Sequence, residues 1–214
     1  NLGAFSMTGG TFDVADLINN ANATITVNGG TFDADKVTNS GAFNISGTSN
    51  VSATLEGKGI YNIYDATLTG DITSNSSLYV TGDKTTLMTD VAGTGKIYVG
   101  YDPVTGADGL GTELLIDGER TVNGTYFYVD DGAKLVVDTG STFNFNGSDT
   151  NSDNYQFCVI GGDLNIAGTL NVDNCSMRFS RSNDSVITGT MNVDGQTCVY
   201  GSNVTVDGKL NITH

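Results

Sequence analysis

The sequence predicts an all-β fold, a parallel β-helix (β-solenoid) in which the chain winds through roughly ten coils of about 17–21 residues. Three observations predict it: a composition poor in helix formers, an internal repeat, and short runs of alternating apolar and polar residues. The 214 residues include 29 glycines, one proline and no tryptophan. Glutamate and glutamine are rare, which leaves few residues for the solvated faces of helices and excludes a helical bundle.

The repeat is clearest in the N-terminal half. Gly9-Gly10-Thr11-Phe12-Asp13 returns twenty residues later as Gly29-Gly30-Thr31-Phe32-Asp33. Two apolar positions also recur, each at steps of 17 to 20 residues: Met7, Val27, Ile45, Ile63, Val80 and Ile97 in one series, and Leu17, Val37, Leu55, Ile72 and Val91 in the other. Because equivalent strands of stacked coils lie about 4.8 Å apart, we expect each series to form an interior ladder.

The C-terminal third has its own version of the repeat. Gly168-Thr169-Leu170-Asn171-Val172 is followed by Gly189-Thr190-Met191-Asn192-Val193, and the pattern returns from Gly208. Between the two regular parts the period stretches, which predicts excursions from the coil near residues 100–125 and 147–156. We therefore expect residues 1–214 to form one solenoid domain, a fragment of a longer repeat protein.

Local patterns support strands joined by tight turns. Runs such as Thr24-Ile25-Thr26-Val27 alternate as half-buried strands do, and glycine, asparagine and aspartate separate the runs. A β-sandwich also has short strands but does not repeat one sequence about every 20 residues. Calcium-binding nonapeptide coils and leucine-rich repeats need other frames, which are absent.

The negative net charge argues against two classes of binding partner. With 24 acidic and 9 basic residues, the formal net charge is −15. Nucleic acid and anionic membrane surfaces both attract basic surfaces, so neither is expected as a partner. No run of 18 apolar residues occurs, so we expect no membrane insertion of this segment.

The repeat predicts that the three cysteines are free thiols, largely in the interior. The surroundings of Cys158 match those of Cys198 at an offset of forty residues, or two coils. Positions two coils apart are separated by about 9.6 Å, beyond the reach of a disulfide, and Cys175 is out of register with Cys198. No zinc-binding cysteine or histidine cluster is present.

No catalytic, cofactor-binding or metal-binding residue is assigned from the sequence. His214 is the last residue and offers no nucleophile system. Asp130 and Asp131 are adjacent, and adjacent side chains on a strand point to opposite faces, so this pair is a weak catalytic candidate. Asp131-Gly132 is typical of a turn. Calcium ligation by acidic residues of the excursions stays open as a minor alternative: Asp102 and Asp108 in the first, Asp149 and Asp153 in the second.

Two residue types invite a recognition role and also have plainer explanations. Arg120, Arg178 and Arg181 are too few to hold the carboxylates of acidic sugars, and Arg178 with Arg181 marks at most a small anion patch. An external aromatic ladder that stacks on sugars or proteins, or half-buried strand aromatics, explain the tyrosines of successive coils equally well: Tyr61, Tyr64, Tyr79, Tyr98 and Tyr101.

Asn-x-Ser/Thr sequons are frequent, and alternation of asparagine with threonine in strands produces them without glycosylation. Ten begin at Asn22, Asn44, Asn50, Asn75, Asn123, Asn146, Asn174, Asn183, Asn203 and Asn211.

The degenerate Gly-Gly-Thr-Phe-Asp repeats, the Gly-Thr-Leu-Asn-Val coils and the acidic, cysteine-poor composition resemble bacterial autotransporter passengers and filamentous surface adhesins. The resemblance covers nearly the whole chain in rhythm and carries no catalytic motif. It implies a right-handed β-helix displayed outside the cell, commonly for adhesion.

The leading functional hypothesis is a structural or adhesive segment of a secreted or bacterial cell-surface solenoid, non-catalytic and without cofactors. It would bind a host protein or glycan through the excursions, where loops on a rigid rod place specificity. The alternative is a polysaccharide lyase or glycosidase on the same scaffold, a fold-level analogy. An ice-binding surface would need Thr-x-Thr in every coil, and the pattern does not persist.

Overall fold

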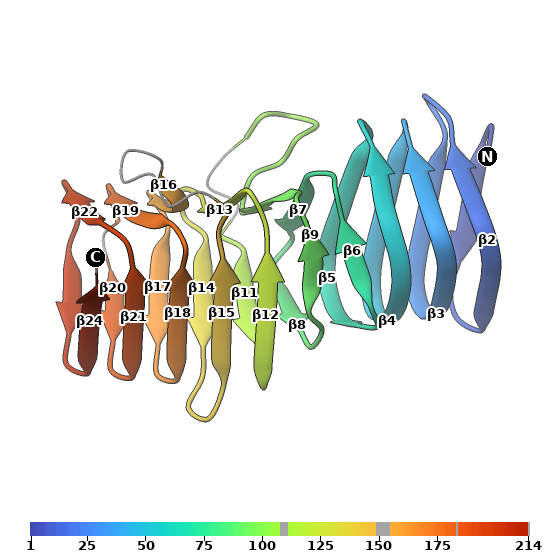
Figure 1. Cartoon of the computed structure of the whole chain (residues 1–214). Helices are drawn as coiled ribbons and strands as arrows, with labels where there is room; N and C mark the ends of the chain where they lie inside the picture. Colours follow the sequence, from blue (N-terminus) through green and yellow to red (C-terminus); the bar gives the residue numbers. More distant parts are fainter. Residues whose placement is uncertain (108–110, 149–154, 183, 214) are drawn as a thin grey trace.

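The computed structural model confirms a β-solenoid of about ten coils, with the N-terminus at one end of a rod and the C-terminus towards the other (Figure 1). The structure describes residues 1–107, 111–148, 155–182 and 184–213. All pairings between its named strands are parallel, and each strand pairs with the equivalent strand of the next coil. The paired strands form three ladders along the rod.

The first ladder collects the strand that opens each coil. It contains β1 (Ala4–Met7), the first parts of β3 (Thr24–Asn39), β4 (Ala42–Gly57) and β5 (Ile60–Thr69), then β7 (Leu78–Thr81), β10 (Lys96–Val99), β13 (Tyr126–Val129), β16 (Tyr155–Ile160), β19 (Ser176–Ser180) and β22 (Thr197–Tyr200).

The other two ladders are merged in the N-terminal coils and separate afterwards. In the first coils β2 (Thr11–Asn19) and the second parts of β3 and β4 run through both. Beyond them the second ladder contains the second part of β5, then β8 (Lys84–Leu87), β11 (Glu113–Ile116), β14 (Lys134–Val137), β17 (Asp163–Ile166), β20 (Ser185–Ile187) and β23 (Val204–Val206). The third contains β6 (Ile72–Ser74), β9 (Val91–Gly93), β12 (Glu119–Asn123), β15 (Thr142–Asn146), β18 (Thr169–Asp173), β21 (Thr190–Asp194) and β24 (Lys209–Thr213).

The expected interior ladders exist, with one register error in each. Met7, Val27, Ile45, Ile63 and Val80 are paired in that order, but Val80 pairs with Val99, and Ile97 pairs with Leu78. In the second series Leu55 pairs with Ser74, while Ile72 pairs with Ala53. Both errors are two residues, the strand period, so each side chain still faces the interior and the alternation alone could not separate the two registers.

Buried aromatic rings fill wide parts of the core. Phe12 and Phe32 stack at 5.4 Å between ring centroids, and Phe127 and Phe157 stack at 5.0 Å with ring planes 11° apart. Phe32, Phe127 and Phe157 are fully buried. Because strand residues alternate between faces, Tyr126 and Tyr128, the neighbours of Phe127, point outward and are half-buried.

The C-terminal repeat is explained by close contact between coils. Gly168, Gly189 and Gly208 each directly precede a strand of the third ladder: β18, β21 and β24. A Cβ on Gly189 would lie 2.0 Å from the carbonyl oxygen of Gly168. Three positions on, Asn171, Asn192 and Asn211 face outward. With Asn144 they form the asparagine ladder, in which each amide Nδ2 donates to the Oδ1 of the preceding coil at 2.6–2.7 Å.

The excursions are shorter than the sequence predicted. β11 and β12 lie within residues 100–125 and are regular rungs of the solenoid, so the first excursion ends by residue 112. β16 begins at Tyr155 and includes buried Gln156, so residues 155 and 156 belong to the coil and not to the second excursion. The expected ranges were too long because turn residues at strand boundaries are of the same types as loop residues.

Candidate functional site: an ordered loop over a tyrosine ladder

After β10 the chain leaves the rod, and residues 100–107 stand away from it (Figure 1). Gly100 turns the chain out of the ladder with φ of +87°, a conformation that glycine adopts without strain. Residues 102 and 107 then face each other in an antiparallel bridge, with the Asp102 N–H donating to the Ala107 carbonyl at 3.0 Å. The chain between them therefore forms a closed turn, which we call the Asp102 turn (residues 102–107).

The carboxylate of Asp102 organises this turn. One oxygen accepts the N–H of Val104 at 2.8 Å, and the other accepts the hydroxyl of Thr105 at 2.7 Å. These bonds, that of Thr105 first, lower the pKa of Asp102 because they stabilise its charged form. Val104 is held at the tip with 75% of its surface exposed. The turn is thus an ordered loop that presents an apolar side chain.

Outside the first ladder, three tyrosines of successive coils stack on one another. Tyr79 on β7, Tyr98 on β10 and Tyr128 on β13 are register partners. Their ring centroids are 5.2 Å and 4.9 Å apart, and the ring planes differ by 11° and 9°. Each lies between two buried neighbours on its strand, so all three rings point outward and are half-buried. We call these three residues the tyrosine ladder.

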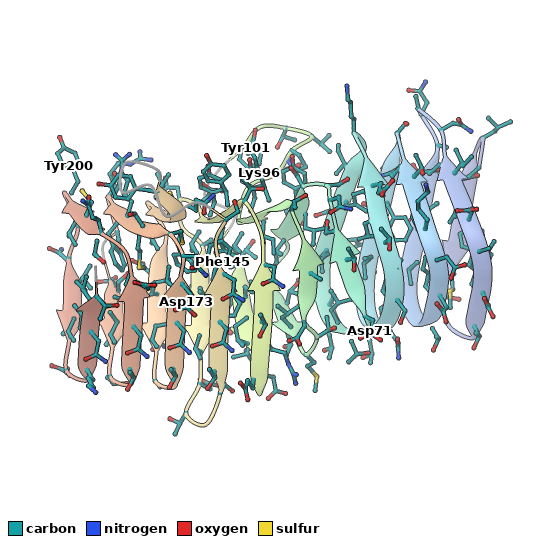
Figure 2. All side chains as sticks on the ribbon, in the orientation of Figure 1. Asp71, Lys96, Tyr101, Phe145, Asp173 and Tyr200 are labelled. Carbon is teal, nitrogen blue, oxygen red and sulfur yellow. The ribbon has the colours of Figure 1, made fainter. Side chains whose placement is uncertain are left out.

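Side chains around the tyrosine ladder join it to the loop. Tyr101 follows β10, and its ring lies 6.1 Å from Tyr79 and 5.9 Å from Tyr98. Tyr126 stacks beside Tyr128 at 5.6 Å, and the Lys96 ammonium lies 4.9 Å from the Tyr126 ring centroid as a cation–π contact. Figure 2 places Tyr101 and Lys96 on the side of the rod from which the loop projects. The ladder is therefore the base on which the loop rests.

The stacking corrects part of the aromatic expectation. Tyr61 is fully buried, and its hydroxyl donates to the carbonyls of Val37 and Glu56, so it belongs to the core. Burial raises its pKa. Tyr64 is half-buried and pairs with Thr81, outside the ladder. The sequence reasoning missed Tyr128, a member of the ladder, and its neighbour Tyr126; their Tyr-Phe-Tyr alternation places both phenol rings on the outer face.

The geometry also limits how the ladder can bind. Near-parallel rings about 5 Å apart use their faces on each other, so the central ring, Tyr98, has a neighbouring ring on both faces. Burial raises the pKa of Tyr98 and Tyr128, and nearby acidic side chains add to the effect, so the phenols stay neutral at physiological pH. A sugar stacked flat on the ring therefore does not fit Tyr98.

The acidic candidates do not converge. Asp130 and Asp131 are the first two residues of a turn. In this turn the Ala133 N–H donates to the Asp130 carbonyl at 3.0 Å, and Gly132 has φ of +70°. The expected turn at Asp131-Gly132 is thus confirmed. Asp108, Asp149 and Asp153 lie outside the described residues, as does His214. Among the residues that the structure describes, no group of three or more histidines, cysteines, aspartates or glutamates is placed to hold a metal ion.

The three cysteines are free thiols, as predicted. Cys158 and Cys198 are indeed two coils apart, with Arg178 as the register partner between them. Cys158 and Cys175 are buried, and burial raises their pKa values to about 11 and about 12; Cys198 is only partly buried. The two buried thiols are therefore protonated at neutral pH and poor nucleophiles.

The arginines are spread along the rod. Arg178 and Arg181 are exposed, and Arg120 donates to the backbone carbonyls of Asp117 and Glu119 at 2.7 and 2.9 Å. Among the sequons, Asn211 donates its side-chain amide to Asn192, whereas Asn22 and Asn174 occupy exposed turns with positive φ. Neither residue type gathers at the loop.

No helix able to span a bilayer occurs in the described part of the chain. A scan of family models, a search of curated proteins and a search of solved structures found no match to this chain. The loop and its tyrosine base therefore rest on their geometry alone as the candidate site.

Proposed function

We propose that this chain is a non-catalytic structural and adhesive segment of a secreted or bacterial cell-surface β-solenoid, similar in role to autotransporter passengers and filamentous adhesins. The rod provides length and rigidity, and the Asp102 turn provides the contact. The partner is a protein or glycan of the surface to which the cell attaches.

The observation that carries this proposal is the order of the Asp102 turn. A loop that its own hydrogen bonds hold in one conformation loses little conformational entropy when it binds, which favours recognition. Its tip exposes Val104, and its base is anchored by Tyr101 on the tyrosine ladder. Loops on rigid scaffolds are common sites of binding, whereas the regular coils offer repeated polar surfaces.

The test compares two surface variants of the full chain. Val104→Asp places a charge at the tip of the turn, and Ile18→Asp makes the same change at an exposed apolar residue of β2 (59% exposed). Attachment to cultured epithelial cells and to a glycan array is measured with the labelled proteins. We expect Val104→Asp to reduce attachment at least severalfold, and Ile18→Asp to leave it unchanged.

Equal attachment by both variants would move the contact away from the turn. A parallel incubation with neutral and acidic polysaccharides addresses the enzymatic alternative. New reducing ends, or unsaturated products, would contradict a non-catalytic role and support a glycosidase or lyase.

A further inference from the structure

The tyrosine ladder brings together three phenols that are distant in the chain. Tyr79 and Tyr98 are 19 residues apart and Tyr98 and Tyr128 are 30 apart, yet their ring centroids lie only 5.2 and 4.9 Å from each other. The parallel backbone pairing fixes this arrangement, because the three residues are direct register partners. Each of the three rings points outward from its strand and is half-buried.

We propose that Tyr79, Tyr98 and Tyr128 form an oxidative cross-linking site, at which hydrogen peroxide and a one-electron catalyst such as a haem peroxidase join neighbouring rings as dityrosine. The site is a modification site and does not depend on whether the Asp102 turn binds a partner.

The reaction balances with peroxide as the oxidant. Each of two phenols gives up one electron and one proton to form a tyrosyl radical, and the two electrons and two protons reduce one hydrogen peroxide to two waters. The radicals then form one carbon–carbon bond between the ring carbons beside the hydroxyls. Loss of a proton from each of these carbons and its return to the oxygen restores both aromatic rings.

The stacked geometry favours coupling within one molecule. Two radicals held on adjacent rungs need no diffusion to meet, so their effective concentration is far above that of radicals on separate chains. Near-parallel planes, 9° and 11° apart, bring the ring carbons of one phenol beside those of the next. Tyr79 and Tyr128 are two rungs apart, about 9.6 Å, and do not couple directly.

The cysteines are not placed to form a covalent cross-link between adjacent coils. Cys158 and Cys198 are separated by the rung of Arg178, and burial keeps the Cys158 thiol protonated. Disulfides therefore do not join these coils, whereas dityrosine joins adjacent rungs. A Tyr98–Tyr128 bond would also close the segment that contains the 100–112 loop, which restricts the unfolded chain and raises stability.

The positions of trypsin sites make the cross-links separable. Cleavage after Lys58, Lys84, Lys96, Arg120 and Lys134 places the three ladder tyrosines in different peptides, residues 59–84, 97–120 and 121–134. The full chain is treated with a haem peroxidase and hydrogen peroxide, and the monomer is isolated by size. Dityrosine fluorescence, the mass of the monomer and tandem mass spectrometry of linked peptides are then measured.

We expect a monomer that has lost two hydrogens per cross-link, with peptide 97–120 joined to 59–84 or to 121–134. Tyr98→Phe keeps the stacked ring but removes the shared partner, so both linked pairs should disappear. Tyr64→Phe should keep both, and Tyr200→Phe, which removes the hydroxyl of a 70%-exposed tyrosine, should reduce only dimers between chains. Cross-linked monomer should also unfold at a higher temperature than untreated protein.

Two results would overturn the proposal. One is dityrosine found only in dimers, and the other is linked peptides whose fragment ions place the bond on tyrosines other than Tyr79, Tyr98 and Tyr128. Because Tyr98→Phe retains its ring, circular dichroism and the unfolding midpoint of the untreated protein show that the fold is unchanged.

Discussion

Two outward ladders run along this rod, and they are built by different chemistry. The tyrosine ladder of the middle coils stacks ring on ring at 4.9–5.2 Å. The asparagine ladder of the C-terminal coils joins amide to amide at 2.6–2.7 Å. Asparagine donates and accepts along the rod and uses these groups on its neighbours, whereas stacked phenols leave their hydroxyls at the outer edge. The middle of the rod is therefore the chemically available surface.

The ladders also show that rung geometry is independent of the chain length between rungs. Successive tyrosines are separated by 19 and 30 residues, and successive asparagines by 27, 21 and 19. Insertions leave the rod at corners and return to the same register. Loops can thus lengthen while the parallel pairing, and the ladder on it, stays intact.

The largest loss of unfolding free energy is expected from a change at the closely packed glycines that precede the strands of the asparagine ladder. Gly189→Ala places a Cβ 2.0 Å from the Gly168 carbonyl oxygen and 2.5 Å from that of Ala167. The backbone cannot move there without strain. We therefore expect the unfolding free energy to fall by about 3 kcal/mol, the upper end of the usual range for overpacking. Urea unfolding followed by circular dichroism measures it. Gly3→Ala, where a Cβ meets nothing within 4 Å, is the control; equal stability of the two variants would contradict the packing argument.

The tyrosine half should depend on its central ring. Tyr98→Ala removes stacking on Tyr79 and on Tyr128, each aromatic pair being worth about 0.5–1.5 kcal/mol, so we expect a loss of about 2 kcal/mol. Tyr98→Phe retains the ring and should stay within about 0.5 kcal/mol of wild type. Urea unfolding of the three proteins separates the ring from the hydroxyl. A large loss in Tyr98→Phe would show that the hydroxyl, and not stacking, stabilises this ladder.

The sequence predicted the fold because alternation and the repeat depend on local pattern. Gly-Thr-Leu-Asn-Val recurs almost unchanged, and the expected pairing of Leu170, Met191 and Leu210 is confirmed. The tyrosine ladder was only partly predicted, because the loop between Tyr98 and Tyr128 breaks the period that would align them. The Asp102 turn could not be predicted in detail, because its order comes from hydrogen bonds within six residues of a nonrepeating segment.

The stability lost when an asparagine of the ladder is replaced should depend on its position in the ladder. Asn192 donates to Asn171 and accepts from Asn211, whereas Asn211 has only the bond to Asn192 within the ladder. We expect Asn192→Ala to lower the unfolding free energy by about 1 kcal/mol and Asn211→Ala by about half as much, since each of these partly buried side-chain hydrogen bonds contributes little in net terms. Chemical unfolding compares them. Equal losses would mean that the amides act singly and not as a connected ladder.

The smallest expected effect concerns a carboxylate beside that ladder. Burial and then the charge of Asp194 raise the pKa of Asp173, labelled in Figure 2. A carboxyl whose pKa is higher in the folded state than in the unfolded state costs no stability below the unfolded value, near 3.9, and lowers stability as the pH rises through the folded value. Asp173→Asn should therefore match wild type at low pH and exceed it by a few tenths of a kcal/mol at pH 7, because the site is largely open to water. Urea unfolding at pH 3.5 and at pH 7 measures the difference, with exposed Asp207→Asn as the control. A gain of the same size at both pH values would assign the effect to the amide itself and not to relief of charge repulsion.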